Sequence, residues 1–202
     1  MLRNWKKILW RTGAVIFAAY IVLVIARMPH AYEQQKTDEQ VAKIHATKLT
    51  LDDVLGKNLP PDPGAHADIT VQGIDANRNG IRDDVELAIF KEYPNSAKTR
   101  AELLQYALAL QMEVIQPMVN IKIVTEVVRE QSRAYACVGE LLSRKDMNTY
   151  IKINDQLLSF VKTQQFNTDT RKTARKDFVK KIGSYSESTN RVCDFDHSVL
   201  PN

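Results

Sequence analysis

The stretch AELLQYALALQMEVIQPMVNIKIVTEVV, residues 101–128, decides the fold class of this 202-residue chain. Its apolar residues recur at steps of three, four or seven, which is the spacing of one helical face, and further apolar residues widen that face. They are Leu104, Leu108, Met112, Ile115, Val119, Ile123 and Val127, joined by Leu103, Leu110, Val114, Ile121, Val124 and Val128. The stretch therefore predicts a mostly buried central helix within residues 96–142, kinked or broken at Pro117, whose ring removes a backbone donor.

Helical spacing and helix stop signals predict further helices on both sides of this stretch. They are residues 51–55 between the N-cap Thr50 and Gly56, residues 87–93 before Pro94, residues 146–166, and residues 168–182 before a capping Gly183. No alternation of period two continues for long. The sequence predicts an all-α fold, a small helical bundle with a kinked central helix.

The first 27 residues have the layout of an export signal. They contain five of the 28 basic residues and no acid, and an uncharged apolar run covers residues 12–26 before the helix breaker Pro29. A spanning helix needs about 20 residues, so a run of this length suits either a membrane anchor or a cleaved signal. The basic cluster would keep the N-terminus cytoplasmic. We expect an inner-membrane protein with a periplasmic C-terminal domain, or a periplasmic or secreted protein if the leader is cleaved.

The net charge of +4 belongs to that leader, because residues from Met28 onward contain 23 basic and 24 acidic residues. The overall charge therefore gives no argument for a nucleic-acid partner. One basic run on the last predicted helix is a candidate contact for anionic lipid or another anionic envelope polymer, although a solvated helix face is the favoured explanation. This run consists of Arg171, Lys172, Arg175, Lys176 and Lys180.

After the leader, we expect four parts in the chain. Residues 28–57 form a polar spacer with one short helix, and residues 58–74 form a loop rich in Pro and Gly. Residues 75–86 are the candidate site, and residues 87–202 form the helical domain.

The candidate site reads DANRNGIRDDVE and matches the calcium-loop pattern D-x-[DN]-x-[DN]-G-x5-E at every specified position. Calcium takes six to eight oxygen ligands, which this spacing supplies by wrapping one loop around the ion. The expected ligands are Asp75, Asn77, Asn79, the Ile81 carbonyl, Asp83 directly or through water, and both oxygens of Glu86. The alternative is a turn at Asn79-Gly80 followed by a helix N-cap. That interpretation does not explain why Asp75 and Asn77 occur at alternating positions before the turn.

These twelve residues resemble the loop of the EF-hand superfamily, with two departures. Arg82 stands where EF-hands usually have an apolar residue, and the preceding segment is too rich in Pro and Gly for an entering helix. The loop therefore looks more like the single loops of dockerins and thrombospondin type 3 repeats. A weaker resemblance, over residues 73–107, is to uncharacterised exported bacterial proteins. Only Asp75, Asp83 and Glu86 would bring full negative charge to the ion, so we expect a weak, structural Ca²⁺ site with a dissociation constant of about 10⁻⁴ to 10⁻³ M.

Two cysteines, Cys137 and Cys193, follow the leader. In an oxidising compartment such a pair is expected to form a disulfide, and two buried free thiols are the alternative. A metal site at the cysteines is less favoured, because we find neither a C-x-x-C spacing nor a histidine placed to assist. The four histidines are expected at the surface; they are His30, His45, His66 and His197.

No G-x-S-x-G, phosphate-binding glycine loop or H-E-x-x-H pattern occurs in the sequence. We therefore expect a calcium-binding envelope protein with a binding or structural role. The alternative is a small envelope hydrolase that uses the ion as a structural support.

Overall fold

The computed structural model describes residues 2–117, 119–186 and 191–201, and these form an all-α protein without β-strands. The helices are α1 (Leu2–Ala46), α2 (Leu51–Leu55), η1 (Gly64–Asp68), α3 (Asp83–Glu92), α4 (Ala97–Ile115), α5 (Ile121–Cys137), α6 (Met147–Gln165), α7 (Asp169–Val179) and η2 (His197–Val199). The predicted fold class is confirmed. The chain divides into two compact units, residues 1–40 and residues 41–202, which we describe separately.

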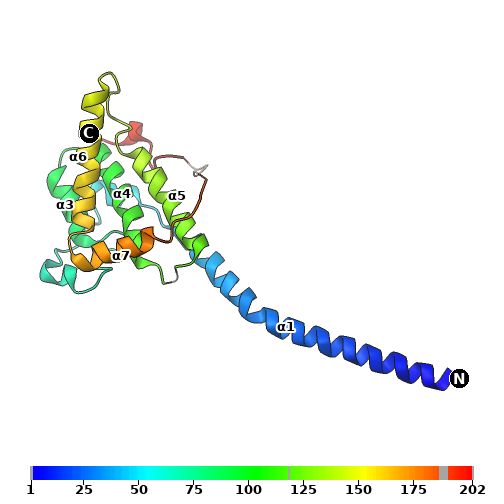
Figure 1. Cartoon of the computed structure of the whole chain (residues 1–202). Coiled ribbons are helices and arrows are strands. Elements are labelled where there is room, and N and C mark those ends of the chain that lie inside the picture. The colour runs from blue at the N-terminus through cyan, green and yellow to red at the C-terminus, as the bar shows by residue number, and fades with distance from the viewer. Residues whose placement is uncertain (1, 118, 187–190, 202) are drawn as a thin grey trace. The chain divides into compact units, whose positions relative to one another are not determined.

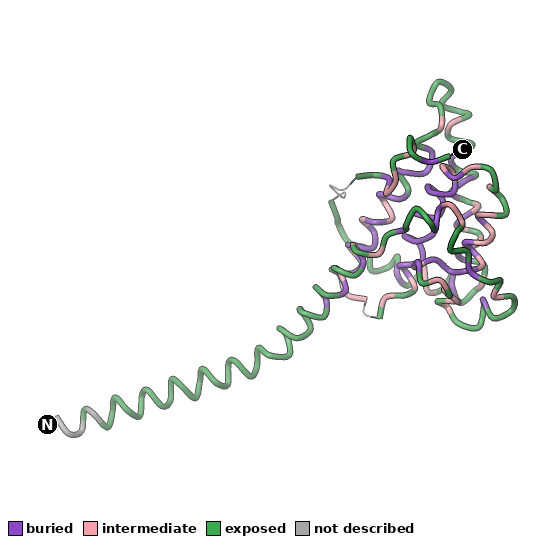
Figure 2. Tube along the Cα trace, turned by 180° about the vertical axis from the view of Figure 1, so that it is seen from behind, coloured by how far each residue is buried: buried purple, intermediate pink, exposed green. Residues whose placement is uncertain are grey.

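The first unit consists of α1 up to residue 40. Its residues 7–36 are exposed, as Figure 2 shows in green. Among the residues that the structure describes, α1 is the one helix long and apolar enough to cross a membrane, a test that a signal sequence also passes. The helix continues through Pro29, where we expected a break, and extends to Ala46. Good helix formers follow the proline, so one missing backbone donor does not end the helix.

The second unit begins inside the segment that we predicted to be a polar spacer. Ile44, Leu49 and Val54 are buried in its hydrophobic core, so residues 41–57 belong to the helical domain. The short helix α2 is closed as expected. Thr50 and Asp53 form a reciprocal capping box, and Gly56 ends the helix with a φ of 78°.

Helix α4 is the centre of the second unit and packs against α2, α3, α5, α6 and α7. Figure 1 shows these helices gathered around it, with α7 crosswise to α6. Every residue from Arg100 to Glu113 is buried, which confirms a mostly buried central helix. The buried positions of Figure 2, in purple, lie mainly in the interior of this unit.

The predicted central helix is broken, not merely kinked. Helix α4 ends at Ile115, and α5 begins at Ile121, where the Oδ1 of Asn120 accepts a hydrogen bond from the Ile123 backbone over 3.0 Å. A new N-cap five residues beyond Ile115 restarts the helix after Pro117. Ile121, which we placed on the buried face, is 63% exposed as a result of this break.

The remaining helices end close to their predicted positions, with two differences. Helix α5 ends at Cys137, because Gly139 turns the chain with a φ of 87°. Helix α7 ends at Val179 and is capped by Lys180, so the predicted cap Gly183 lies outside it. Helix α3 ends at Glu92, two residues before Pro94. Helix α6, Met147–Gln165, confirms the helix predicted over residues 146–166.

Candidate functional site

The candidate calcium loop, residues 75–86, runs from the end of the Pro- and Gly-rich segment into α3. Asp83 is the first residue of α3 and Glu86 lies in its first turn. Gly80 has a φ of 87°, and a Cβ there would lie 2.6 Å from Leu108 Cδ1 of α4. Only glycine therefore allows both this backbone conformation and this close approach. The glycine of the motif fixes the loop against the central helix.

Backbone N–H groups of the loop hold several of its side-chain oxygens in place. The carboxylate of Asp75 accepts from Asn79 over 3.1 Å and from Gly80 over 2.9 Å. The Oδ1 of Asn79 accepts from Ile81 over 2.8 Å, and Asp83 accepts from Ala76 over 2.9 Å. The expected ligand side chains therefore have fixed orientations within a closed turn.

Glu86 is the least solvated of these carboxylates, with no exposed surface. Its Oε1 atom is buried without a hydrogen-bond partner, and burial raises the pKa of the carboxyl group to about 7. The carboxylates of Asp53 and Asp83 raise that pKa further, while the side chains of Asn77 and Asn79 lower it. A buried carboxylate with an unused oxygen is costly unless a cation or a proton neutralises it.

The two asparagines complete the loop in a way that the motif alone does not describe. Asn77 Nδ2 donates to Glu86 Oε2 over 3.0 Å and to the Asn58 carbonyl over 2.8 Å, while Asn79 Nδ2 is buried without a partner. The Asn77 amide thus faces Glu86 with its nitrogen, and an ion would require the amide oxygen to face inward. Asn58 lies 19 residues before Asn77, so the motif gave no sign of it.

Burial also raises the pKa values of Asp75 and Asp83. The carboxylates of Asp75 and Asp84 add to the raised pKa of Asp83, and that of Asp83 adds to the raised pKa of Glu86. The donor set is entirely oxygen, which suits a hard cation such as Ca²⁺. The side chains of the loop are therefore of the kind that the motif requires.

Arg82, the unusual eighth residue of the loop, is fully buried. Its guanidinium group donates to the carbonyls of Gln164 over 2.8 Å and Gln165 over 3.1 Å, and it pairs with Asp84. These are carbonyls at the C-terminal end of α6, which helix geometry leaves without intrahelical donors. In place of the apolar residue of paired EF-hands, this loop has a polar attachment to a neighbouring helix.

The predicted anionic-surface set does not form one basic surface. Arg171 is 1% exposed, and its guanidinium group donates to the carbonyls of Ala67, Thr70 and Val71. This residue fastens the segment before the calcium loop to α7 and is not available to a surface ligand. A buried arginine is hard to recognise from sequence, because the carbonyls that hold it lie about one hundred residues earlier.

The other members of that set lie nearer the surface. Lys172 and Lys180 are exposed and pair with Asp169 and Asp177 of their own helix, and Lys176 is exposed. Arg175 is partly buried over the ring of Phe166. These contacts are those of an ordinary solvated helix face.

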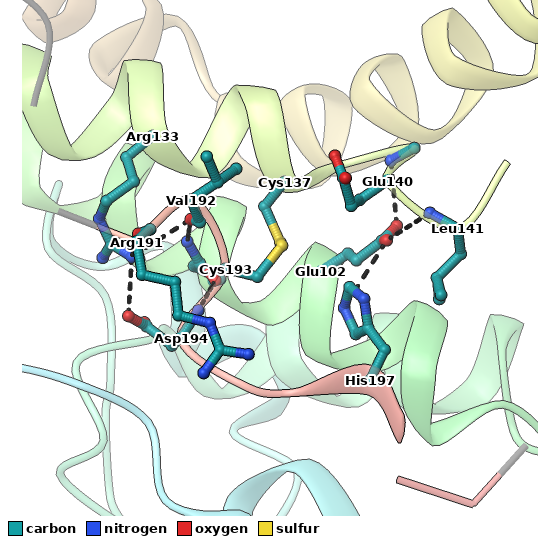
Figure 3. Close-up of a disulfide and its surroundings, with 12 residues drawn as sticks. Glu102, Arg133, Cys137, Glu140, Leu141, Arg191, Val192, Cys193, Asp194 and His197 are labelled. Carbon is teal, nitrogen blue, oxygen red and sulfur yellow. Dashed lines mark hydrogen bonds and ion pairs between the residues drawn. A yellow bond between two sulfur atoms is a disulfide. The ribbon is translucent and has the colours of Figure 1, made fainter. Parts of the chain in front are cut away.

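Cys137 and Cys193 form a disulfide, with their Cα atoms 5.1 Å apart. Figure 3 shows His197 close beside it. The two sulfurs and a ring nitrogen of His197 lie within 4.8 Å of one another. Among the described residues, these three side chains are thus a group that could hold a metal ion. Our statement that no histidine assists the cysteines was wrong. The spacing Cys193-x3-His197 was the sequence signal, and His197 is 14% exposed where we expected a surface residue.

Comparison of the chain with protein-family models, with curated proteins and with solved structures finds no match in any of the three. The candidate calcium loop and the apolar first helix are therefore the features of the chain that bear on its function.

Proposed function

We propose that this protein is an exported, calcium-binding helical protein of the cell envelope, in which the ion is structural. The observation that carries the proposal is Glu86, a fully buried carboxylate with one unpartnered oxygen at the closing position of a complete calcium-loop pattern. The residues that would hold the ion are Asp75, Asn77, Asn79, the Ile81 carbonyl, Asp83 and Glu86. Bound calcium would neutralise the negative charge of this buried carboxylate and coordinate its unpartnered oxygen.

A structural role is favoured over calcium-dependent switching. The loop is fixed on three sides: Gly80 abuts Leu108, Asn77 bonds to Asn58, and Arg82 bonds to the end of α6. An ion there would join the start of the loop at Asp75 to the first turn of α3 at Glu86. Because Glu86 is buried, it is also poorly placed to contact a substrate, which favours a binding or structural protein over a hydrolase.

Two features of the chain support a location in the cell envelope. Helix α1 carries a long apolar segment, and the only two cysteines are joined in a disulfide, which is typical of oxidising compartments. We infer that the second unit is periplasmic, held by α1 as an inner-membrane anchor, or is released into the periplasm or medium if the leader is cleaved. The partner would be another envelope protein or an anionic envelope polymer.

Calorimetric titration of the full chain in detergent with CaCl₂, after chelation of bound metal, tests the calcium site. We expect one site with a dissociation constant of about 10⁻⁴ to 10⁻³ M and no comparable heat from MgCl₂. Thermal unfolding should shift upward with calcium, since a ligand at ten times its dissociation constant stabilises by about 1.4 kcal/mol.

The matched pair of variants is Glu86→Gln and Glu92→Gln, which change one carboxylate at each end of α3. Glu86→Gln should abolish the calcium-induced shift, whereas Glu92→Gln, at an exposed position, should retain it. A wild-type melting temperature that does not move at several millimolar calcium would sink the proposal.

A further inference from the structure

The side chains of Cys137, Cys193 and His197 come from the end of α5 and from the C-terminal segment, residues 191–201. Two sulfurs and an imidazole nitrogen form a soft donor set, which prefers Zn²⁺ or Cu⁺ to the hard Ca²⁺. Their candidate ligand atoms lie within 4.8 Å of one another while the sulfurs are joined as a disulfide. We propose that reduction of this disulfide creates a zinc site, with Cys137, Cys193 and His197 as ligands.

The proposal requires the C-terminal segment to stay in place once the disulfide is broken, and its other contacts provide this. Gln105 of α4 donates to the Val192 carbonyl over 2.9 Å and accepts from the Asp194 backbone over 2.9 Å. Arg133 of α5 donates to Asp194 over 2.8 Å, and Leu200 is buried in the core. Figure 3 shows the Arg133–Asp194 pair beside the disulfide. The segment therefore has several noncovalent attachments close to both sulfur atoms.

Glu102 of α4 gives the histidine a carboxylate neighbour. Its Oε1 atom lies 3.8 Å from Nε2 of His197, a buried ring nitrogen without a hydrogen-bond partner. The carboxylate itself is held by the backbone N–H groups of Gly139 and Leu141, at 3.0 and 3.3 Å. Metal-ligating histidines usually have such a carboxylate beside the imidazole, where it orients the ring. Glu102 is therefore a positioning residue of the site.

The redox step uses a dithiol as reductant. Two electrons and two protons pass from the dithiol to the bond between Cys137 and Cys193, which gives two protein thiols and the reductant's own disulfide. Zn²⁺ then displaces both thiol protons to solvent and forms two Zn–S bonds and one Zn–N bond. Two thiolates at about 2.3 Å from a tetrahedral zinc lie about 3.8 Å apart, so the sulfurs must separate after reduction. Three protein ligands leave the fourth position open to water or to another ligand.

The test compares zinc binding by the full chain in detergent before and after reduction with a phosphine, which carries no thiol to compete for metal. We expect the reduced protein to bind Zn²⁺ at least about 100-fold more tightly than the oxidised protein. Co²⁺ used as a probe should give thiolate-to-metal charge-transfer bands only after reduction. Calcium affinity of the loop should be unchanged by reduction, which keeps this inference separate from the proposed function.

Variants separate ligands from bystanders. His197→Ala should lower the zinc affinity of the reduced chain at least tenfold, and Glu102→Gln about tenfold, whereas His66→Ala, at an exposed residue of η1, should leave it unchanged. Circular dichroism of each reduced variant shows whether the helices persist. The inference is overturned if the reduced wild type binds zinc no better than the Cys137→Ser, Cys193→Ser double variant, or if His197→Ala binds as tightly as the wild type.

Discussion

Arg82 donates a hydrogen bond over 3.1 Å to the carbonyl of Gln165, the last residue of α6. The eighth position of the candidate calcium loop is thereby attached to a helix that begins more than sixty residues later in the sequence. The side chain that departs from the EF-hand pattern is thus part of the domain's packing.

We predict that Arg82→Met lowers the free energy of unfolding by about 3 kcal/mol. The substitution leaves the carbonyls of Gln164 and Gln165 and the carboxylate of Asp84 without their buried donor, and removal of one partner from a buried charged pair typically costs this much. Urea unfolding followed by circular dichroism measures the change. Arg144→Met is the control, because Arg144 is exposed and its pair with Glu140 is too, so a loss below about 1 kcal/mol is expected. Equal effects in the two variants would contradict the role assigned to Arg82.

We predict that Gly73→Ala destabilises the domain more than Gly64→Ala. Both glycines have positive φ angles, 71° and 53°, so both substitutions carry a backbone penalty of about 1 kcal/mol. At Gly73 the new Cβ would also lie 2.1 Å from Cδ of Arg82, whereas nothing lies within 4 Å at Gly64. The difference, about 1 to 3 kcal/mol in urea unfolding, measures the packing of Arg82 against the chain. Identical losses would mean that Arg82 moves aside freely.

Stability in the presence of a chelator should fall as the pH rises from about 4.5 to about 7. The pKa values of Glu86, Glu102 and Glu113 are raised by burial from 4.5 to about 7, so in this window the folded state keeps protons that the unfolded state has lost. His197 acts in the opposite direction, because burial lowers its pKa below 6.5, but it is one group against the three glutamates and against Asp75 and Asp83, whose pKa values burial also raises. Urea midpoints measured across this range should show the fall.

Calcium should change that pH profile in one specific way. A bound ion holds Glu86 ionised, so the part of the slope caused by Glu86 should disappear at saturating calcium while the parts caused by Glu102 and Glu113 persist. Glu86→Gln in chelator should also flatten the profile, but less than calcium flattens that of the wild type, because a bound ion holds Asp75 and Asp83 ionised as well. A profile that calcium leaves unaltered would argue against binding at this carboxylate.

Removal of the disulfide by Cys137→Ala and Cys193→Ala together should cost about 4 kcal/mol, because the bond closes a loop with a sequence separation of 56. The measurement is urea unfolding of the double variant against oxidised wild type. The native contacts of Arg133 and Gln105 with residues 192–194 should remain, so near-ultraviolet circular dichroism of the folded variant should stay close to the wild-type spectrum. A loss below about 1 kcal/mol would show that the unfolded chain is already compact.

The sequence was most informative where local signals agree. The spacing of apolar residues located α4. The N-cap Thr50 and the stop signal Pro94 placed helix ends to within a few residues. Whether a helix continues through a proline was harder to predict. Pro29 and Pro117 have the same intrinsic effect on a helix, yet α1 continues through Pro29, whereas the helix is interrupted at Pro117. After Pro117, Asn120 provides an N-cap from which a new helix can start. After Pro29 no such N-cap signal follows.

The candidate sites show the same division. The calcium-loop pattern is local, so its residues were predicted from spacing alone. The burial of Arg82 and Arg171, the contact of Asn77 with Asn58 and the approach of Glu102 to His197 join segments 19 to 104 residues apart. Such contacts depend on how the helices pack, which no local pattern of one sequence specifies.

The disulfide also gives the domain a different covalent topology from a simple chain. Residues 137–193 form a closed ring that includes α6 and α7, the two helices to which Arg82 and the segment around Ala67 are attached. A protease that cuts one peptide bond within this ring produces a nicked molecule whose fragments are still covalently linked. A single cleavage there would therefore not release either of these helices from the protein.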